Sequence, residues 1–291
     1  MSPLIIDPYR PTSATPSRRK PWPKNFALAW ARLEDVRDIV TVEFDAFKGE
    51  TTNHILSFRD WTQERDRKRA RGLYHDAMQG VEGVRQRMKS ARRMERKSNT
   101  DIVRFRKVTD TETGLIISFA KSEFKMYTED ELASPADSGH EHEAIMNREW
   151  FALNEQLRRE YMGTRRHCYI SMLATLCAYQ HRGAGRMLLD AILREADDAG
   201  IECYLEATGT AKPLYERRGF QTVNVLEFDP SHYGVDGFRV ERQTIMVRGA
   251  WDSTTKQRKP VRSWHEATGR EGSPSPSTNS SAESSENEGG A

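Results

Sequence analysis

The spacing of apolar residues predicts short strands and amphipathic helices along the chain. FALAWARL is typical of a strand, and the helical pattern of LEDVRDIVTVEFDAFK overlaps and follows it. Two further β-type runs, DIVRFRKVTD and LIISFAKSEFKM, are separated by TETG, whose Gly114 gives the backbone the freedom that a tight connection needs. The first half of the chain therefore predicts a β-α unit and an antiparallel hairpin.

Apolar periodicity in the second half predicts a β-α-β unit. TEDELASPADSGHEHEA is polar and predicts a loop, and IMNREWFALNEQLRREYM after it has helical spacing. HCYISMLATL then has the length and continuity of a strand, AGRMLLDAILREADDAG is amphipathic, and IECYLEA is a second strand. A strand, helix and strand in this order place the two strands side by side and parallel.

The predicted domain closes with a short helix and a hairpin. TAKPLYERRGF carries Pro213 in its first turn and Gly219 just past its end, as helices prefer. VNVLEFD and FRVERQTIMVRG after it have the alternation of two strands. Together these elements predict an α/β domain whose mostly antiparallel central sheet contains one parallel pair.

Composition marks both ends of the chain as tails. Residues 1–24 are rich in Pro, Ser, Thr and Arg, and residues 251–291 include SPSPSTNSSAESSENEGGA. Such segments bury too little apolar surface to offset the entropy lost on ordering. We therefore expect disordered tails on either side of one domain at about 25–250.

Charge and cysteine content limit the classes of partner. Lys and Arg number 45 against 43 Asp and Glu, so a net charge of +2 gives no reason to expect nucleic acid. No stretch has the pattern of a signal peptide or a membrane anchor. Cys168, Cys177 and Cys203 lie in the predicted core without metal-ligand spacing. We expect buried thiols, no metal site, no membrane partner and a cytoplasmic or nuclear location.

A basic helical insertion is predicted at about 59–98. It opens with RDRKRAR and ends with ARRMERK, but acidic residues alternate with the basic ones. This alternation favours a solvated helix face over a nucleic-acid-binding patch. The segment is also a candidate lid over a substrate site.

A glycine turn is the strongest chemical signal in the chain. QHRGAGR, from Gln180, lies between a strand and its helix, where free helix amides can bind a pyrophosphate. Arg182 and Arg186 add side-chain donors for phosphate oxygens. No Gly-Lys-Ser/Thr follows, which excludes a P-loop. On spacing alone, a purely steric use of glycine remains open, and so does a dinucleotide site with Glu206 at the end of the next strand.

LATLCAYQHRGAGRMLLDAI resembles the central motif of the GNAT acetyltransferase superfamily, and ECYLEATGTAKPLYERRGF resembles its second motif. With EWFALNEQLRREYMG upstream, the chain is similar to a group of fungal GNAT proteins of mostly unassigned substrate. The resemblance covers about 148–223, with the cofactor core at about 166–220. It implies the GNAT fold, a mixed sheet with a splayed parallel pair and helices on both faces, and acetyl-CoA as co-substrate.

The resemblance also implies roles for individual residues. A strand end would pair with the pantetheine arm, the glycine turn would hold the diphosphate, and one residue stands where many members have an asparagine. The residues implied for the strand end are Leu173, Ala174 and Thr175. Those implied for the glycine turn are Gln180, His181, Arg182, Gly183, Ala184, Gly185 and Arg186, and the residue at the asparagine position is Thr208. Tyr215 falls on the tyrosine that often protonates the leaving thiolate.

The chemistry of acetyl transfer requires a proton acceptor, because an ammonium has no lone pair with which to attack a thioester. Alternation along IECYLEA turns Glu206 toward the splayed slot, so Glu206 is the candidate base. A salt bridge or helix cap at Glu206, a water wire, and His232 remain alternatives, whereas His167 is expected to be structural. The oxyanion formed when the amine attacks the thioester would accept a hydrogen bond from a backbone N–H near Leu173 or Thr175.

We therefore expect an N-acetyltransferase that joins acetyl-CoA to a primary amine of a small molecule or peptide by direct attack in a ternary complex. The alternative is a catalytically silent acyl-CoA-binding regulatory module. The identity of the acceptor and the oligomeric state have no signature in the sequence.

Overall fold

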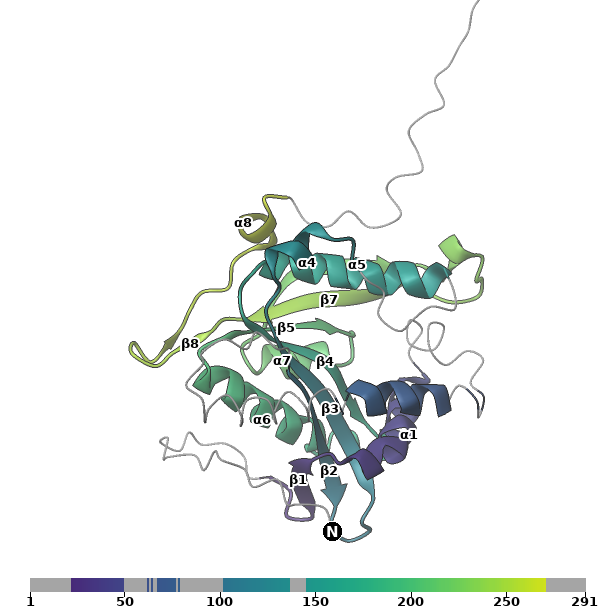
Figure 1. Ribbon diagram of the computed structural model, residues 1–291. Coiled ribbons are helices and arrows are strands. Elements are labelled where there is room, and N and C mark those ends of the chain that lie inside the picture. The colour runs from purple at the N-terminus through teal and green to yellow at the C-terminus, as the bar shows by residue number, and fades with distance from the viewer. Residues whose placement is uncertain are drawn as a thin grey trace, which may run out of the picture.

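The computed structural model describes residues 22–49, 62, 64, 67–76, 78, 102–136 and 145–270. Most of the predicted N-terminal tail, most of the basic insertion, and 271–291 lie outside the described residues. Figure 1 shows a twisted central sheet with helices on both faces. None of the helices described has the length and apolar character needed to cross a bilayer.

Seven strands form the central sheet in the described part of the chain, in the order β1-β2-β3-β4-β5-β7-β6. The strands are β1 Phe26–Trp30, β2 Ile102–Asp110, β3 Ile116–Lys125, β4 His167–Thr175, β5 Glu202–Ala207, β6 Gln221–Phe228 and β7 Glu241–Arg248. Neighbouring strands are antiparallel except β4 and β5, which are parallel. The predicted mixed sheet with one parallel pair is confirmed, and β7 lies between β5 and β6.

Helix α6 covers one face of the sheet. It runs over Ala184–Asp198 and buries its apolar stripe against alternate residues of the strands. These include Cys168 of β4 and Cys203 and Leu205 of β5, which point to the same side. The short helix α7, Lys212–Glu216, packs into the same cluster. The larger part of the hydrophobic core therefore lies between α6 and the sheet.

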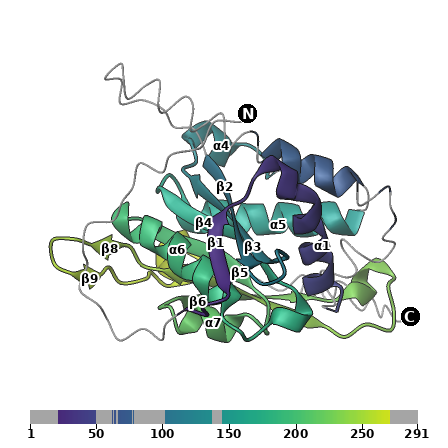
Figure 2. The same cartoon turned by 90° about the horizontal axis from the view of Figure 1, so that it is seen from below.

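Two helical groups share the opposite face. Helix α1, Val36–Phe47, and the helical residues 67–76 pack over β3 and β4. Helix α5, Ile145–Met162, packs over β5, β6 and β7. Figures 1 and 2 show α1 and α5 on the same side of the sheet, across from α6. Between these two helical groups, the surface of the sheet carries polar side chains.

A helix stands where the sequence predicted a polar loop. Helix α4 spans Glu129–Ala133 and begins at Thr128. The Thr128 hydroxyl accepts from the Glu131 amide at 3.2 Å, and the Glu131 carboxylate accepts from the Thr128 amide at 2.7 Å. This capping box satisfies amides that a short helix otherwise leaves open. The prediction of a loop is therefore wrong over Glu129–Ala133, where the T-x-x-E pattern of Thr128 and Glu131 starts a helix.

The predicted C-terminal tail begins too early. Residues 251–270 form the strands β8 (Trp251–Asp252) and β9 (Gln257–Arg258) and the helix α8 (Trp264–Thr268). Trp264 is 4% exposed, and its ring stacks on Tyr161 of α5 at 5.6 Å. One buried aromatic thus anchors a segment whose composition is otherwise polar. We call residues 249–270 the C-terminal arm.

Gly249 offers a test of how tightly the C-terminal arm packs. A Cβ at this position would stand 2.0 Å from the Lys259 carbonyl oxygen, a backbone atom that cannot swing away. Gly249→Ala should lower the free energy of unfolding by about 2 kcal/mol or more, measured by denaturant titration. Gly209→Ala is the control, because nothing lies within 4 Å of its Cβ position. Equal stability of the two variants would contradict the packing of the arm.

Candidate functional site

The parallel strands β4 and β5 part in the middle of the sheet. They pair at three positions, the last being Tyr169 with Tyr204. Beyond this pair β4 continues along β3 to Thr175, and β5 continues along β7 to Ala207. Ser171 of β4 has no opposite residue on β3, which makes it a β-bulge, and bulges bend and twist a strand. The opening implied by the resemblance is present in the structure; it begins after Tyr169, just before the bulge.

The glycine turn lies at the end of β4, where the resemblance placed it. A single 3-10 turn, Cys177–Tyr179, leads through Gln180 to Gly183, the N-cap of α6. Gly183 has a φ of +103°, and His181 has a φ of +60°. No side chain caps the first turn of α6, and no acidic residue stands in it. The amides at this helix end therefore face outward with the geometry that binds an anion.

Polar contacts hold this turn in shape. Gln180 Nε2 donates to the Thr175 carbonyl at 3.4 Å, and the Thr175 hydroxyl lies 2.7 Å from that of Ser118. Asp45 of α1 accepts from the Cys177 amide at 2.7 Å. Hydrogen bonds from Lys48 and from that amide lower the pKa of Asp45. The side chains of Gln180 and Thr175 are therefore engaged within the protein, and α1 is bound to the turn.

The cofactor-binding residues predicted from the sequence come together at this corner. A Cβ on Gly185 would contact Thr175 Oγ1 at 3.5 Å and Leu214 of α7 at 3.9 Å, so strand end, turn and α7 meet there. Ala184 is 1% exposed. The side chain of Leu173 packs against the α6 cluster and that of Ala174 against the α1 cluster.

The predicted arginines flank the turn. The Arg182 guanidinium lies 5.1 Å from the Tyr179 ring, and Arg186 lies 3.7 Å from Asp190. Arg182 is exposed, and Arg186 is partly buried on the first turn of α6. Thr208, further along, accepts from the amides of residues 211 and 212 at 3.2 and 3.0 Å through its carbonyl, and so starts α7.

The two predicted catalytic residues lie on different faces of the sheet. Tyr215 of α7 is 6% exposed and packs in the α6 cluster, with its ring 5.7 Å from that of Phe220. Glu206 of β5 points to the opposite face, with Tyr204, as the alternation predicted. Any reaction that uses both groups must therefore take place in the opening between β4 and β5, where the faces communicate.

Glu206 is buried at the edge of the opening. Its side chain is 7% exposed, and burial raises its pKa to about 7 although Arg158 and the Tyr169 hydroxyl lower it. Arg158 Nη1 lies 3.8 Å from Glu206 Oε1. Desolvation is thus the larger effect, and the carboxyl group changes its protonation state near neutral pH.

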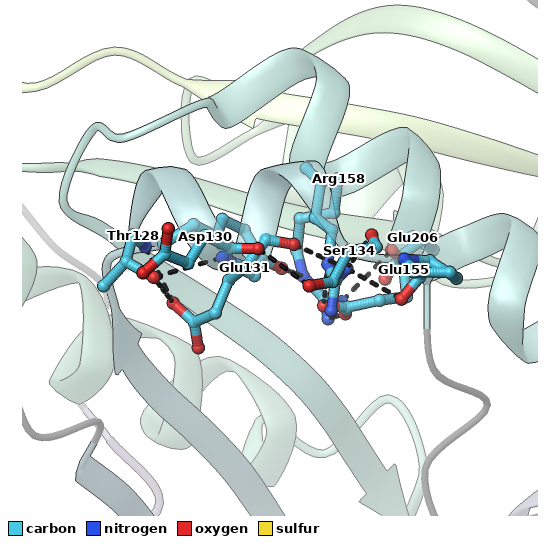
Figure 3. Close-up of polar contacts among 10 residues, drawn as sticks. Thr128, Asp130, Glu131, Ser134, Glu155, Arg158 and Glu206 are labelled. Atoms are coloured by element: carbon cyan, nitrogen blue, oxygen red, sulfur yellow. Dashed lines mark hydrogen bonds and ion pairs between the residues drawn. The ribbon is translucent and has the colours of Figure 1, made fainter.

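Helix α5 supplies polar residues that the sequence analysis missed. Arg158 is 6% exposed, donates from Nε to the Tyr127 hydroxyl at 2.8 Å and pairs with Glu155. Figure 3 shows Glu155, Arg158 and Glu206 grouped beneath α5. Asn147, Asn154 and Arg158 share the buried stripe of α5 with Trp150 and Tyr161. Polar residues within an apolar helical stripe were the available signal.

The histidines and one cysteine have simpler roles. His232 is 43% exposed and lies 3.7 Å from Asp229 on the surface. His167 is buried, with Nδ1 2.9 Å from the Arg165 carbonyl, and burial lowers its pKa to about 4, as expected of a structural histidine. Cys177 is exposed, so the prediction that it is buried was wrong. The chain leaves the sheet after Thr175, which places Cys177 at the surface.

The described part of the basic insertion packs on the face that carries Glu206. Arg69 binds Glu43 of α1 with two hydrogen bonds, at 3.0 and 2.7 Å, and lies 3.7 Å from the Met172 sulfur of β4. Lys121 of β3 binds Asp76 at 2.8 Å. This segment and α5 thus stand on either side of the polar sheet surface, and its role as a lid stays a prediction.

Comparison with known proteins agrees with this geometry. Residues 143–230 match the family described as acetyltransferase (GNAT) domain. Among curated proteins there is no match. A solved structure of a mosquito protein, arylalkylamine N-acetyltransferase like 5b, is 13% identical over 77% of this chain and 99% of its own, with a TM-score of 0.51. The fold is therefore shared.

Two further solved structures are similar at lower TM-scores. The histone acetyltransferase HPA2 and related acetyltransferase from Corynebacterium glutamicum is 19% identical over 79% of this chain and 99% of its own, with a TM-score of 0.45. The acetyltransferase yncA from Salmonella typhimurium, solved with acetyl-CoA, is 13% identical over 79% of this chain and 96% of its own, with a TM-score of 0.46.

The raised pKa of Glu206 gives a stability prediction. Relative to an unfolded carboxyl with a pKa of 4.5, a folded pKa of about 7 adds stability that is present below pH 4.5 and lost as pH rises through 7. Glu206→Gln should therefore raise the free energy of unfolding at pH 8 by roughly 2 to 3 kcal/mol, and by much less at pH 5. Glu112→Gln, at an exposed turn, should change neither value. Denaturant titration at both pH values checks this, and a destabilised Glu206→Gln protein at pH 8 would contradict it.

Proposed function

We propose that this chain, whose residues 143–230 match the GNAT acetyltransferase domain, uses acetyl-CoA as co-substrate and transfers the acetyl group directly to a primary amine of a small molecule or peptide. The observation that carries the proposal is the opening between β4 and β5, which has an uncapped helix end at one side and a buried carboxyl group at the other. The first suits a coenzyme diphosphate and the second suits the removal of a proton.

The diphosphate would bind at the N-terminus of α6. Its uncapped amides and the partial positive charge of a 15-residue helix favour an anion there. Arg182 and Arg186 flank the turn and add charge-assisted donors. From this end the pantetheine arm would run along β4, whose edge toward β5 pairs with no strand beyond Tyr169 in the described sheet. Backbone groups at Leu173 and Thr175 would then meet the thioester.

Glu206 would accept the proton of the amine. A base is most effective when its pKa lies near the working pH, and the pKa of about 7 at Glu206 meets this condition. The neutral amine would attack the thioester carbon, and a backbone N–H of β4 would stabilise the oxyanion. Collapse would expel the coenzyme A thiolate, which the Tyr215 hydroxyl would protonate.

Turnover tests the assignment of Tyr215. In a thiol-release assay with acetyl-CoA, at least one of a panel of polyamine, arylalkylamine, aminoglycoside and peptide amines should raise thiol release above a water-only control. Tyr215→Phe should then lower kcat by roughly a hundredfold or more, because proton transfer by a positioned side chain is worth about a hundredfold to ten-thousandfold. Its coenzyme A affinity should be unchanged. Coenzyme A binding without turnover on any amine would instead identify a silent binding module.

Coenzyme binding tests the glycine turn. Gly183→Ala should weaken coenzyme A binding at least about tenfold by calorimetry, because a methyl at φ +103° strains the loop whose amides hold the diphosphate. Gly114→Ala is a matched control, since Gly114 has a φ of +75° in the β2–β3 turn, far from α6 in sequence. It should show the same backbone strain and full affinity. Equal affinity in the two variants would refute the diphosphate site.

A further inference from the structure

The buried guanidinium of Arg158 lies near two carboxyl groups, although one would neutralise its charge. The residue is 6% exposed, and a buried cation must be paired to avoid a penalty of several kcal/mol. Its ion pair with Glu155, one turn away on α5, already supplies one opposite charge. The Tyr127 hydroxyl accepts from Nε at 2.8 Å. These contacts leave Nη1 directed toward Glu206.

The contact with Glu206 differs from the others in kind. Nη1 and Oε1 are 3.8 Å apart, close enough for strong electrostatic attraction and too long for a hydrogen bond. Among the described residues, Glu206 Oε1 has no hydrogen-bond partner although it is buried. The oxygen is therefore held near a cation while its lone pairs stay available to take a proton.

Tyr169 links the same two residues. The guanidinium carbon of Arg158 lies 3.6 Å from the centre of the Tyr169 ring, a cation–π contact that holds the guanidinium against this ring. The Tyr169 hydroxyl forms a hydrogen bond with Glu206. Tyr169 is also the last residue of β4 that pairs with β5. Arg158, Tyr169 and Glu206 thus form one unit at the point where the strands part.

We propose that Arg158 is the positioning residue for Glu206 in acetyl transfer. Held by Glu155, Tyr127 and the Tyr169 ring, it fixes the carboxylate at the opening and keeps its anion accessible without donating a hydrogen bond to it. This inference rests on the proposed function, in which Glu206 accepts the proton of the amine.

The groups around Glu206 act on its charge in opposite directions. Arg158 and the Tyr169 hydroxyl lower the pKa of Glu206, whereas burial and the negative charge of Glu155 raise it. Tyr204 of β5 and Glu123 of β3 complete the set: Glu206 raises the pKa of Tyr204 and of Tyr169, and Glu123 raises that of Tyr169. Removing the charge of Arg158 should therefore raise the pKa of Glu206, and removing the charge of Glu155 should lower it.

The pH dependence of kcat/KM with acetyl-CoA and an accepted amine tests the proposal. In the wild-type protein activity should fall as pH drops through about 7, because Glu206 then becomes protonated. Arg158→Gln should move this acid limb upward by roughly one pH unit. Glu155→Gln should move it downward, and Arg158→Lys should leave it between those of the wild type and Arg158→Gln. The titration of the amine is common to all variants and cancels in the comparison.

Three controls separate positioning from damage. Glu206→Gln should abolish the Glu206-dependent limb, and adding Arg158→Gln to it should cause no further shift. Coenzyme A affinity should be the same in all variants. The proposal would be overturned if the acid limbs of Glu155→Gln and Arg158→Gln had the same midpoint pH. A loss of kcat that is equal at every pH, with no shift of the limb, would overturn it as well. If Arg158→Gln does not fold, the downward shift in Glu155→Gln decides.

A protein with no turnover on any amine would refute the proposed function separately. The ¹³C resonance of the Glu206 carboxyl group would then be titrated by NMR in the wild type and in Glu155→Gln. A lower midpoint in the variant would support the electrostatic link between α5 and Glu206, and equal midpoints would overturn it.

Discussion

The arrangement of the site depends on hydrogen bonding at the edges of two parallel strands. Each of β4 and β5 has an antiparallel neighbour that continues past the last β4–β5 pair, β3 on one side and β7 on the other. The strands can separate because each keeps a full ladder on its outer edge. The inner edges are then left with backbone groups that need partners, and an amide-bearing ligand such as pantetheine supplies them.

The same opening explains where the protein places its costly groups. A carboxyl group, a guanidinium and several phenols are buried together on the α5 face, whereas the α6 face combines a large apolar core with buried ion pairs such as those of Arg106 with Glu195 and of Arg248 with Asp197. Burying so many polar groups disfavours folding unless each one is satisfied. The apolar core beneath α6, in which Leu188 and Ile192 are fully buried, offsets the cost of burying the polar side chains on the α5 face.

Sequence reasoning predicted the cofactor side better than the acceptor side. The strand, glycine turn, helix and strand from His167 to Ala207 follow local rules of periodicity and capping, and the structure contains each of them. Glu206 was assigned to the correct face by alternation alone. Arg158 was missed because its importance arises from a contact between α5 and β5, 48 positions apart in the chain. Spacing within one element carries no information about such contacts.

The C-terminal arm was missed for a related reason. Its composition is polar, and its place in the domain depends on contacts with distant residues, such as the packing of Trp264 against Tyr161 and the ion pair of Arg258 with Asp197 of α6. The Tyr161 hydroxyl also donates to the Arg262 carbonyl at 2.6 Å, so the last turn of α5 is joined to the arm twice.

The insertion of β7 between β5 and β6 has a consequence for biosynthesis. Strand β5 has no partner on its outer edge until β7 has left the ribosome, and the last turn of α5 waits longer still for Trp264. The glycine turn proposed to bind the coenzyme diphosphate lies between β4 and α6, which precede β5 in the chain and can pack on each other while translation continues. The proposed proton acceptor Glu206 lies on β5, so its surroundings are complete only after β7 has been added to the sheet.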